Sequence, residues 1–152
     1  SVIETFETRI NSSSMVVDSQ NEIYLLSSGN YADVNPALLR INTTTNQIIQ
    51  TFDIPIGSMT QAGDWIYYFD EDLKHAKRFN TTEEIFDTNV IIDCADYETF
   101  FGLQFDPDLN LIFCFDANGY VNSSTVRAYN TAGVLQFEFT AELNARRIIY
   151  ND

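Results

Sequence analysis

Hydrophobic residues occur in short runs along the whole chain, and almost none of them recur at helical spacing. Val, Ile, Thr, Tyr and Phe cluster in runs of four to eight residues, separated by Asn, Asp, Gly, Ser and Pro. The runs at 23–26, 66–69 and 111–115 do not alternate with polar residues, which predicts strands covered on both faces. The run at 135–140 alternates, which predicts a strand with one face in water. The pattern predicts an all-β protein.

A hairpin phrase is repeated three times. In each copy an apolar run ends at an Asn-Thr turn and a second apolar run follows. The copies read ALLRINTTTNQIIQTF from Ala37, AKRFNTTEEIFDT from Ala76 and VRAYNTAGVLQFEF from Val126.

A second phrase precedes each hairpin, as NEIYLLSSG, DWIYYFDED and NLIFCFDANG. The matched residues Ile23, Ile66 and Ile112 are 43 and 46 residues apart. Such a period is typical of the four-stranded blades of a β-propeller. We therefore predict blades at 13–53, 58–92 and 100–140.

The first predicted blade has strands near 13–18, 22–28, 37–42 and 47–53, and the second has strands near 58–62, 64–70, 75–80 and 84–92. The third has strands near 100–106, 110–116, 124–130 and 134–140. An outer strand at 2–9 and an inner strand at 146–150 are left over. Since propellers need about four to eight blades, we expect an incomplete ring whose missing blades come from the rest of a longer protein or from a second copy.

The composition supports a packed domain with a strongly acidic surface. The chain is 45% hydrophobic and 14% aromatic, with Lys+Arg 8 against Asp+Glu 22 and a net charge of −14. This charge excludes nucleic acids and anionic lipids as favoured partners, because their phosphates would be repelled. No apolar run is long enough to predict a membrane span. Cys94 and Cys114 form no metal or redox motif, and the sequence leaves free thiols or one disulfide as alternatives.

The sequence gives only weak evidence for catalytic or metal-binding residues. His75 is the only histidine, and no nucleophile pattern lies near it. The stretch 106–110 begins like a calcium loop but lacks its Gly and final Glu, so a turn is the simpler interpretation. The acidic groups at 70–72 and 93–98 are interpreted as solvated loop charge. We predict a protein without catalytic residues, metal or cofactor.

The phrases LLRINTTTNQIIQTF and FGLQFDPDLNLIFCFDANGY resemble those of YncE-like, surface-layer-type β-propellers, such as the surface lipoproteins of gut Bacteroidetes. The resemblance implies a ring of about seven blades in a secreted or surface-anchored protein, with an outer-membrane lipoprotein as the expected form. It also implies capture of a substrate, since some relatives bind corrinoids.

In a propeller, loops at one face surround the central channel and commonly carry the ligand site. The loops expected there are 28–36, 53–58, 70–74, 93–100, 116–123 and 141–146. Tyrosine gives rigid amphipathic contacts, so the predicted ligand-binding residues are Asn30, Tyr31, Asp96, Tyr97, Asn118 and Tyr120. Their alternative role is to cap the loops.

The predicted function is non-enzymatic capture of a small-molecule nutrient such as a corrinoid. A structural or protein-interaction propeller is the alternative, and a metal-assisted hydrolase or lactonase is a weaker one.

Overall fold

The computed structural model describes residues 5, 7–30 and 32–149, which form three antiparallel sheets. The prediction of an all-β protein is confirmed. The first sheet has the order β1-β2-β3-β4, so each strand pairs with its neighbour in the chain. Its strands are β1 (Ser12–Val17), β2 (Glu22–Ser27), β3 (Ala37–Asn42) and β4 (Gln47–Phe52).

The other two sheets repeat this order. The second sheet contains β5 (Ile56–Ala62), β6 (Trp65–Asp70), β7 (His75–Asn80), β8 (Ile85–Phe86) and β9 (Ile92–Asp93). The third contains β10 (Phe100–Asp106), β11 (Leu111–Asp116), β12 (Ser123–Asn130) and β13 (Leu135–Leu143), with the 3-10 turn η1 (Asn118–Tyr120) between β11 and β12. The register is also repeated, because the three matched residues pair as Ile23 with Ile41, Ile66 with Phe79 and Ile112 with Tyr129.

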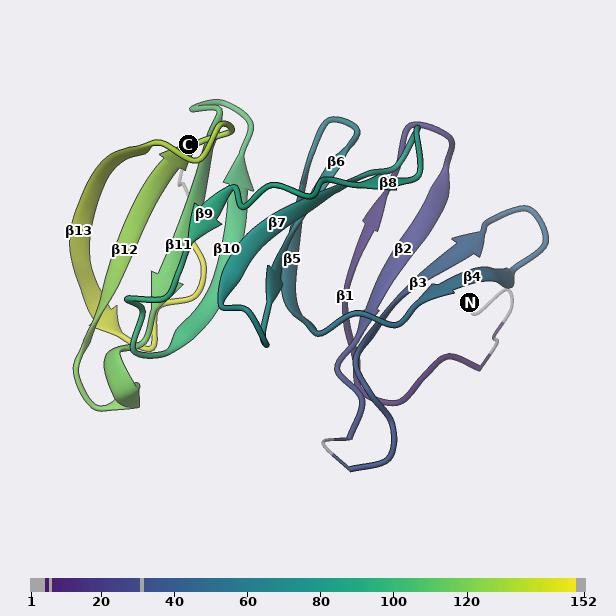
Figure 1. Cartoon of the computed structure of the whole chain (residues 1–152), viewed down its shortest axis with the longest axis horizontal. Helices are drawn as coiled ribbons and strands as arrows, with labels where there is room; N and C mark the ends of the chain where they lie inside the picture. Colours follow the sequence, from purple (N-terminus) through teal and green to yellow (C-terminus); the bar gives the residue numbers. More distant parts are fainter. Residues whose placement is uncertain (1–4, 6, 31, 150–152) are drawn as a thin grey trace.

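The sheets lie side by side with the second in the middle (Figure 1). One core cluster, which includes Tyr24, Leu38, Ile66 and Phe79, joins the first sheet to the second. Another, which includes Tyr67, Phe69, Ile112, Cys114 and Tyr129, joins the second sheet to the third. The non-alternating runs at 66–69 and 111–115 are therefore buried on both faces, as their pattern predicts, whereas in the run at 23–26 Tyr24 and Leu26 are buried and Ile23 and Leu25 are only partly buried.

The repeated Asn-Thr turns are held by the asparagine side chains. Asn42 Oδ1 accepts hydrogen bonds from the backbone N–H groups of Thr44 and Thr45, and Asn80 Oδ1 accepts from Thr82 and Glu83. Asn130 Oδ1 does the same for two N–H groups of the third turn. A short side chain that bonds the backbone two or three residues ahead fixes a turn, so the repeated phrase specifies the scaffold.

The predicted strand at 84–92 is wrong in part. β7 pairs with β8 near one end and with β9 near the other, and residues 87–91 leave the ladder between them. Asp87 Oδ1 accepts the backbone N–H of Asn89, and this turn bends the chain away. The bond from Asn89 and then the ion pair with Arg78 lower the pKa of Asp87.

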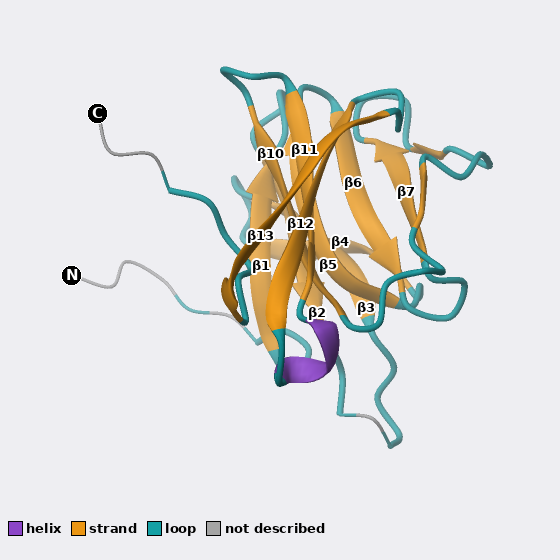
Figure 2. Ribbon diagram, turned by 90° about the vertical axis from the view of Figure 1, so that its left-hand side faces the viewer, coloured by secondary structure: helices purple, strands orange, loops and turns teal. Residues whose placement is uncertain are grey.

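The two leftover strands are not strands in the described residues. Residues 5 and 7–9 have no strand pairing, and the rest of the predicted strand at 2–9 lies outside the described residues. Residues 145–149 form no ladder, and residue 150 lies outside the described part. The segment nevertheless docks on the third sheet, where Ala145 and Ile148 pack beside Phe113 and Phe115. Figure 2 shows it leaving on the side where β1 and β10 lie.

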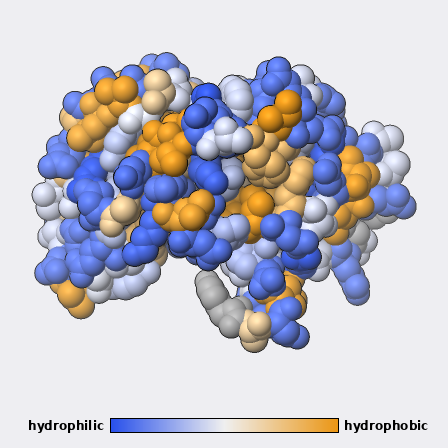
Figure 3. Space-filling view, in the orientation of Figure 1, coloured by the Kyte–Doolittle hydropathy of each residue, from blue (hydrophilic) through white to orange (hydrophobic). Residues whose placement is uncertain are grey.

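The outer faces of the first and third sheets carry exposed apolar side chains. Met15, Val17 and Ile48 are exposed on the first sheet, and Phe137 and Phe139 are exposed on the third. Their register with the neighbouring strands places these side chains on the faces that point away from the second sheet. Figure 3 shows apolar surface at both ends of the molecule.

Both cysteines are free thiols in the core between the second and third sheets. Burial raises the pKa of the Cys94 thiol to about 12 and raises that of Cys114 as well. Of the two alternatives that the sequence leaves open, the structure therefore has the free thiols.

Candidate functional site

The first strand of each sheet, β1, β5 or β10, begins with a bulge at the same place in the register. The pairing shifts between Ser12 and Ser14 in β1, between Ile56 and Ser58 in β5, and between Phe100 and Gly102 in β10. The inserted residues are therefore Ser13, Gly57 and Phe101. Bulges bend a strand and redirect side chains, and they are common beside functional sites.

The three bulges line one cavity. β5 lies against both β1 and β10, which brings the starts of the three strands together. The cavity has a volume of about 370 Å³. We call it the inner-strand cavity, and its lining residues are Ser13, Ser14, Gly57, Ser58, Met59, Phe101, Gly102, Leu103 and Arg146. A second hollow shares four of these residues and extends along the strands to Thr60, Gln104 and Arg147.

Two hydroxyl groups on β5 link the second and third sheets, that of Ser58 in the inner-strand cavity and that of Thr60 in the second hollow. Ser58 Oγ accepts the backbone N–H of Leu103 at 3.3 Å, and Thr60 Oγ1 accepts that of Phe105 at 2.9 Å. A hydroxyl has one proton to donate as well as two lone pairs. Since both oxygens act as acceptors here, each hydroxyl keeps a proton to donate, Ser58 in the inner-strand cavity and Thr60 in the second hollow.

The segment after β13 lies where the inner strand of a next sheet would lie. Gln104 matches Thr60 in the register and bonds both the N–H and the C=O of Ile148 at 2.9 and 3.0 Å. Gln104 of the third sheet thus holds the backbone of Ile148 as Thr60 of the second sheet holds the backbone of Phe105. By this match Arg146 takes the position that Met15, Met59 and Leu103 occupy in β1, β5 and β10.

The charge of the cavity differs from that of the rest of the chain. Among the described residues, Arg146 and Arg147 are in no ion pair, whereas five of the other six Lys and Arg side chains are paired with carboxylates. Lys74 is the sixth. No described Asp or Glu side chain lines either hollow. Two arginines therefore lie in a carboxylate-free hollow of a protein with net charge −14.

Aromatic and acidic side chains contact residues that line the cavity. Tyr120 packs edge-on against Phe101 at 5.4 Å between ring centroids, and the Arg146 guanidinium carbon lies 6.0 Å from the centroid of Phe101. Glu71 lies directly beside Gly57, which has no side chain to displace it. Burial, and then the neighbouring charge of Asp72, raise the pKa of Glu71.

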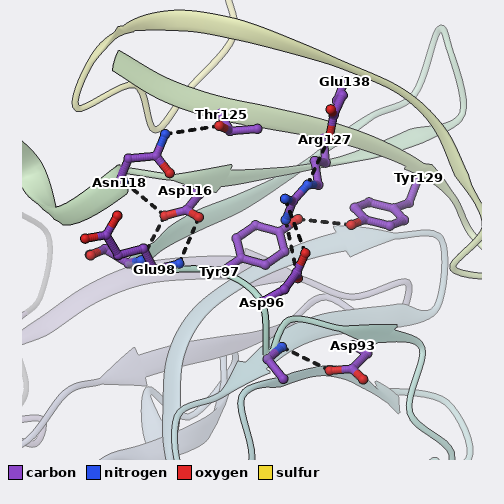
Figure 4. A network of polar contacts seen from close by, with 12 residues as sticks. Asp93, Asp96, Tyr97, Glu98, Asp116, Asn118, Thr125, Arg127, Tyr129 and Glu138 are labelled. Carbon is purple, nitrogen blue, oxygen red and sulfur yellow. Dashed lines mark hydrogen bonds and ion pairs between the residues drawn. The ribbon is translucent and has the colours of Figure 1, made fainter. Parts of the chain in front are cut away.

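The predicted residues Asp96 and Tyr97 belong to a different cluster, which is shown in Figure 4. Tyr97 is 4% exposed, and its hydroxyl lies 3.1 Å from that of Tyr129. The Arg127 guanidinium carbon lies 4.5 Å from the centroid of the Tyr97 ring and pairs with Asp96 and Glu138, at 3.3 Å in each case.

The two tyrosines of this cluster are closed to water, whereas the carboxylates of Asp96 and Glu138 are exposed. Burial raises the pKa of Tyr97 well above its usual range. Burial alone would lower the pKa of Arg127, but the contacts with Tyr97, Asp96 and Glu138 outweigh it and leave this pKa raised. Tyr97 and Arg127 therefore hold the 93–100 loop on the third sheet.

The other predicted residues fall into three groups. Asn30 Oδ1 accepts three backbone N–H groups of its own loop, and Asn118 Nδ2 bonds Ser123 O and Thr125 Oγ1, so both amides cap loops. Tyr120 is 51% exposed, with a φ of 65°, and remains accessible. Tyr31 lies outside the described residues.

The residues considered for catalysis and metal binding have local structural contacts. His75 Nε2 lies 3.8 Å from an Asp93 carboxylate oxygen. Asp106 Oδ1 accepts the N–H groups of Asp108 and Leu109, as expected for a turn. Within the described residues, no group of three or more His, Cys, Asp and Glu side chains is arranged to hold a metal ion. In the same part of the chain, no helix is long and apolar enough to cross a membrane.

The sequence matches no protein-family model and no curated protein.

Proposed function

We propose that the protein is a non-enzymatic binding module of the β-propeller type that captures a small molecule in the inner-strand cavity. The observation that supports this most is that three bulged strands and the 145–149 segment converge on one hollow. Its volume of about 370 Å³ falls in the range usual for small-molecule sites. Its polar lining includes hydroxyl and guanidinium groups that have protons to donate.

The repeated register supports the propeller architecture. Each sheet presents equivalent residues to the next, since Tyr24 and Leu26 face the second sheet as Tyr67 and Phe69 face the third. Phe113 and Phe115 are their counterparts on the outer face of the third sheet. We infer that further blades cover the two outer faces, supplied by the rest of a longer protein or by a second copy.

From the resemblance to YncE-like propellers we propose that the module lies outside the cell or at its surface, in a lipoprotein of the outer membrane. It also makes a corrinoid one candidate ligand. The acidic surface is compatible with this location, because a high net charge favours solubility.

A ligand screen by calorimetry tests the proposal. Ser14→Trp would fill the inner-strand cavity from an exposed position on β1, so we expect it to abolish binding of any ligand found. Thr44→Trp is the matched control, since Thr44 is exposed in an Asn-Thr turn and lines neither hollow. Absence of any ligand, or equal binding by both variants, would contradict the proposal.

A protein-interaction module is the second candidate, and the exposed apolar side chains of the outer faces favour it. Analytical ultracentrifugation measures self-association directly. If a second copy covers these faces, Phe137→Glu should shift the protein to monomer, while Thr44→Glu should not. A wild-type monomer would leave the rest of a longer protein as the source of the missing blades.

A further inference from the structure

We propose that the inner-strand cavity binds an organic oxyanion, that is, a small molecule with a carboxylate or phosphate group. This inference rests on the proposed binding function and specifies the chemical class of the ligand.

The first argument is the local balance of charge. Arg146 and Arg147 are two of only eight basic residues, against 22 acidic ones. Neither forms an ion pair within the described residues. The described lining of both hollows contains no carboxylate. An anion placed in the inner-strand cavity meets the Arg146 guanidinium, and Arg147 lines the adjoining hollow; among the described residues, no carboxylate forms an ion pair with either arginine.

The second argument is the supply of neutral donors. The oxygens of Ser58 and Thr60 accept backbone N–H groups from the third sheet, which directs their hydroxyl protons elsewhere. Ser13 and Ser14 add two further hydroxyl groups from β1. Guanidinium and hydroxyl groups together match the acceptor oxygens of carboxylate and phosphate, and charge-assisted hydrogen bonds of this kind are the strong ones.

The third argument concerns the remainder of the ligand. Met59, Leu103 and the Phe101 ring give the same cavity an apolar side. Tyr120 extends this surface toward the mouth through its edge-on contact with Phe101. A ligand with both an anionic group and an apolar or planar part would use both sides of the cavity.

The arrangement of acidic groups argues against a cationic ligand inside the cavity. Glu71 lies beside Gly57, which lines the cavity, and Glu98 lies beside Gly119, but neither glutamate itself lines the cavity. A cation would be held at the rim, whereas an anion is attracted only once it reaches the arginines. This predicts selection for small anions over large polyanions such as nucleic acids.

The test uses the intact chain with two probes, pyrophosphate for the phosphate group and citrate for the carboxylate group, titrated by calorimetry at low ionic strength. We expect at least one probe to bind, and Arg146→Gln to raise its Kd by about tenfold or more. Arg147→Gln should have a similar or smaller effect. Whichever probe binds more tightly identifies the group.

Lys74→Gln is the matched control, because it removes one unpaired positive charge outside both hollows. It should change the Kd less than twofold. An equal loss in Lys74→Gln and Arg146→Gln would mean non-specific attraction and would overturn the inference. Thermal unfolding of each variant checks that the fold is kept.

The two proposals fail in distinguishable ways. If a neutral or cationic molecule from the screen binds and Ser14→Trp blocks it, while neither anionic probe binds, the oxyanion inference is wrong and the binding function stands. If no molecule of any charge binds, both are contradicted.

Discussion

Arg127 and Arg146 both lie near aromatic rings of the third-sheet region, and their surroundings differ. Arg127 stacks on the buried Tyr97 and pairs with Asp96 and Glu138. Arg146 lies near Phe101 beside a carboxylate-free cavity and forms no ion pair within the described residues. The charge of Arg127 is paired with carboxylates of the same chain, whereas the charge of Arg146 remains available to a ligand. Tyrosines and charges clustered in a loop are therefore a poor sign of a binding site unless their partners are known.

The largest expected effect separates the buried tyrosine from the exposed one. Tyr97→Ala should lower the free energy of unfolding by about 3–4 kcal/mol, because it leaves a cavity beneath Arg127. Tyr120→Ala should change it by less than about 0.5 kcal/mol, since Tyr120 is half exposed. Urea unfolding measures both. Similar losses of unfolding free energy in the two variants would contradict the difference in burial between Tyr97 and Tyr120.

The closed region should also make the protein sensitive to alkali. The pKa of Cys94 rises from 9.0 to about 12 on folding, so the folded state holds a proton that the unfolded state releases between these values. Stability is fully present below pH 9 and falls as pH rises toward 12, by up to about 1.4 kcal/mol per pH unit for one such group.

Cys94→Ala should weaken this alkaline slope in urea unfolding followed from pH 8 to 11. The same burial predicts that neither thiol of the native protein reacts with a thiol reagent at pH 8. Rapid labelling of the native protein, or an unchanged slope, would show that the region is open.

The two arginines should differ in their contribution to stability. Arg127→Met keeps an apolar stem but removes the guanidinium group from Tyr97, Asp96 and Glu138, at a cost of about 1–2 kcal/mol. Arg146→Gln should cost less than about 0.5 kcal/mol. Thermal unfolding of both variants compares them, and a larger loss for Arg146→Gln would mean that Arg146 is a structural residue.

The smallest expected effect lies at the cavity rim. The raised pKa of Glu71 means that its ionised form is disfavoured by folding, so stability is lost as pH rises through the folded-state pKa. Glu71→Gln should gain about 0.3 kcal/mol at pH 7, a small value because solvent screens this exposed side chain. The gain should vanish below pH 4.5, the ordinary pKa. A gain that persists in acid would have another cause.

The fold follows largely from local patterns. The Asn-Thr turns and the isoleucines such as Ile23 and Ile66 determine where the strands begin and how they pair, and both are visible in the sequence. The break in the predicted strand at 84–92 was missed. Asp87 forms a turn there, but the apolar residues around it in the sequence favour a continuous strand.

The site was less accessible to prediction. The bulges at Ser13, Gly57 and Phe101 leave no signal of their own, since a bulge depends on the pairing of two strands. Tyr97 lies in a polar loop, and its partners Arg127 and Tyr129, on a strand distant in the sequence, hold it in the core. One signal was available for Arg146, namely an Arg at the repeat position where Met15, Met59 and Leu103 stand.

A titration of the isotopically labelled chain with the anionic probes, followed by two-dimensional NMR, tests the central claim most directly. We predict that the amide shifts at saturation concentrate at Ser14, Gly57, Ser58 and Gly102, with the Arg146 side-chain signal moving at the same concentration of probe. Shifts confined to the surroundings of Lys74, or no shifts for any probe or screened ligand, would contradict a binding site in the inner-strand cavity.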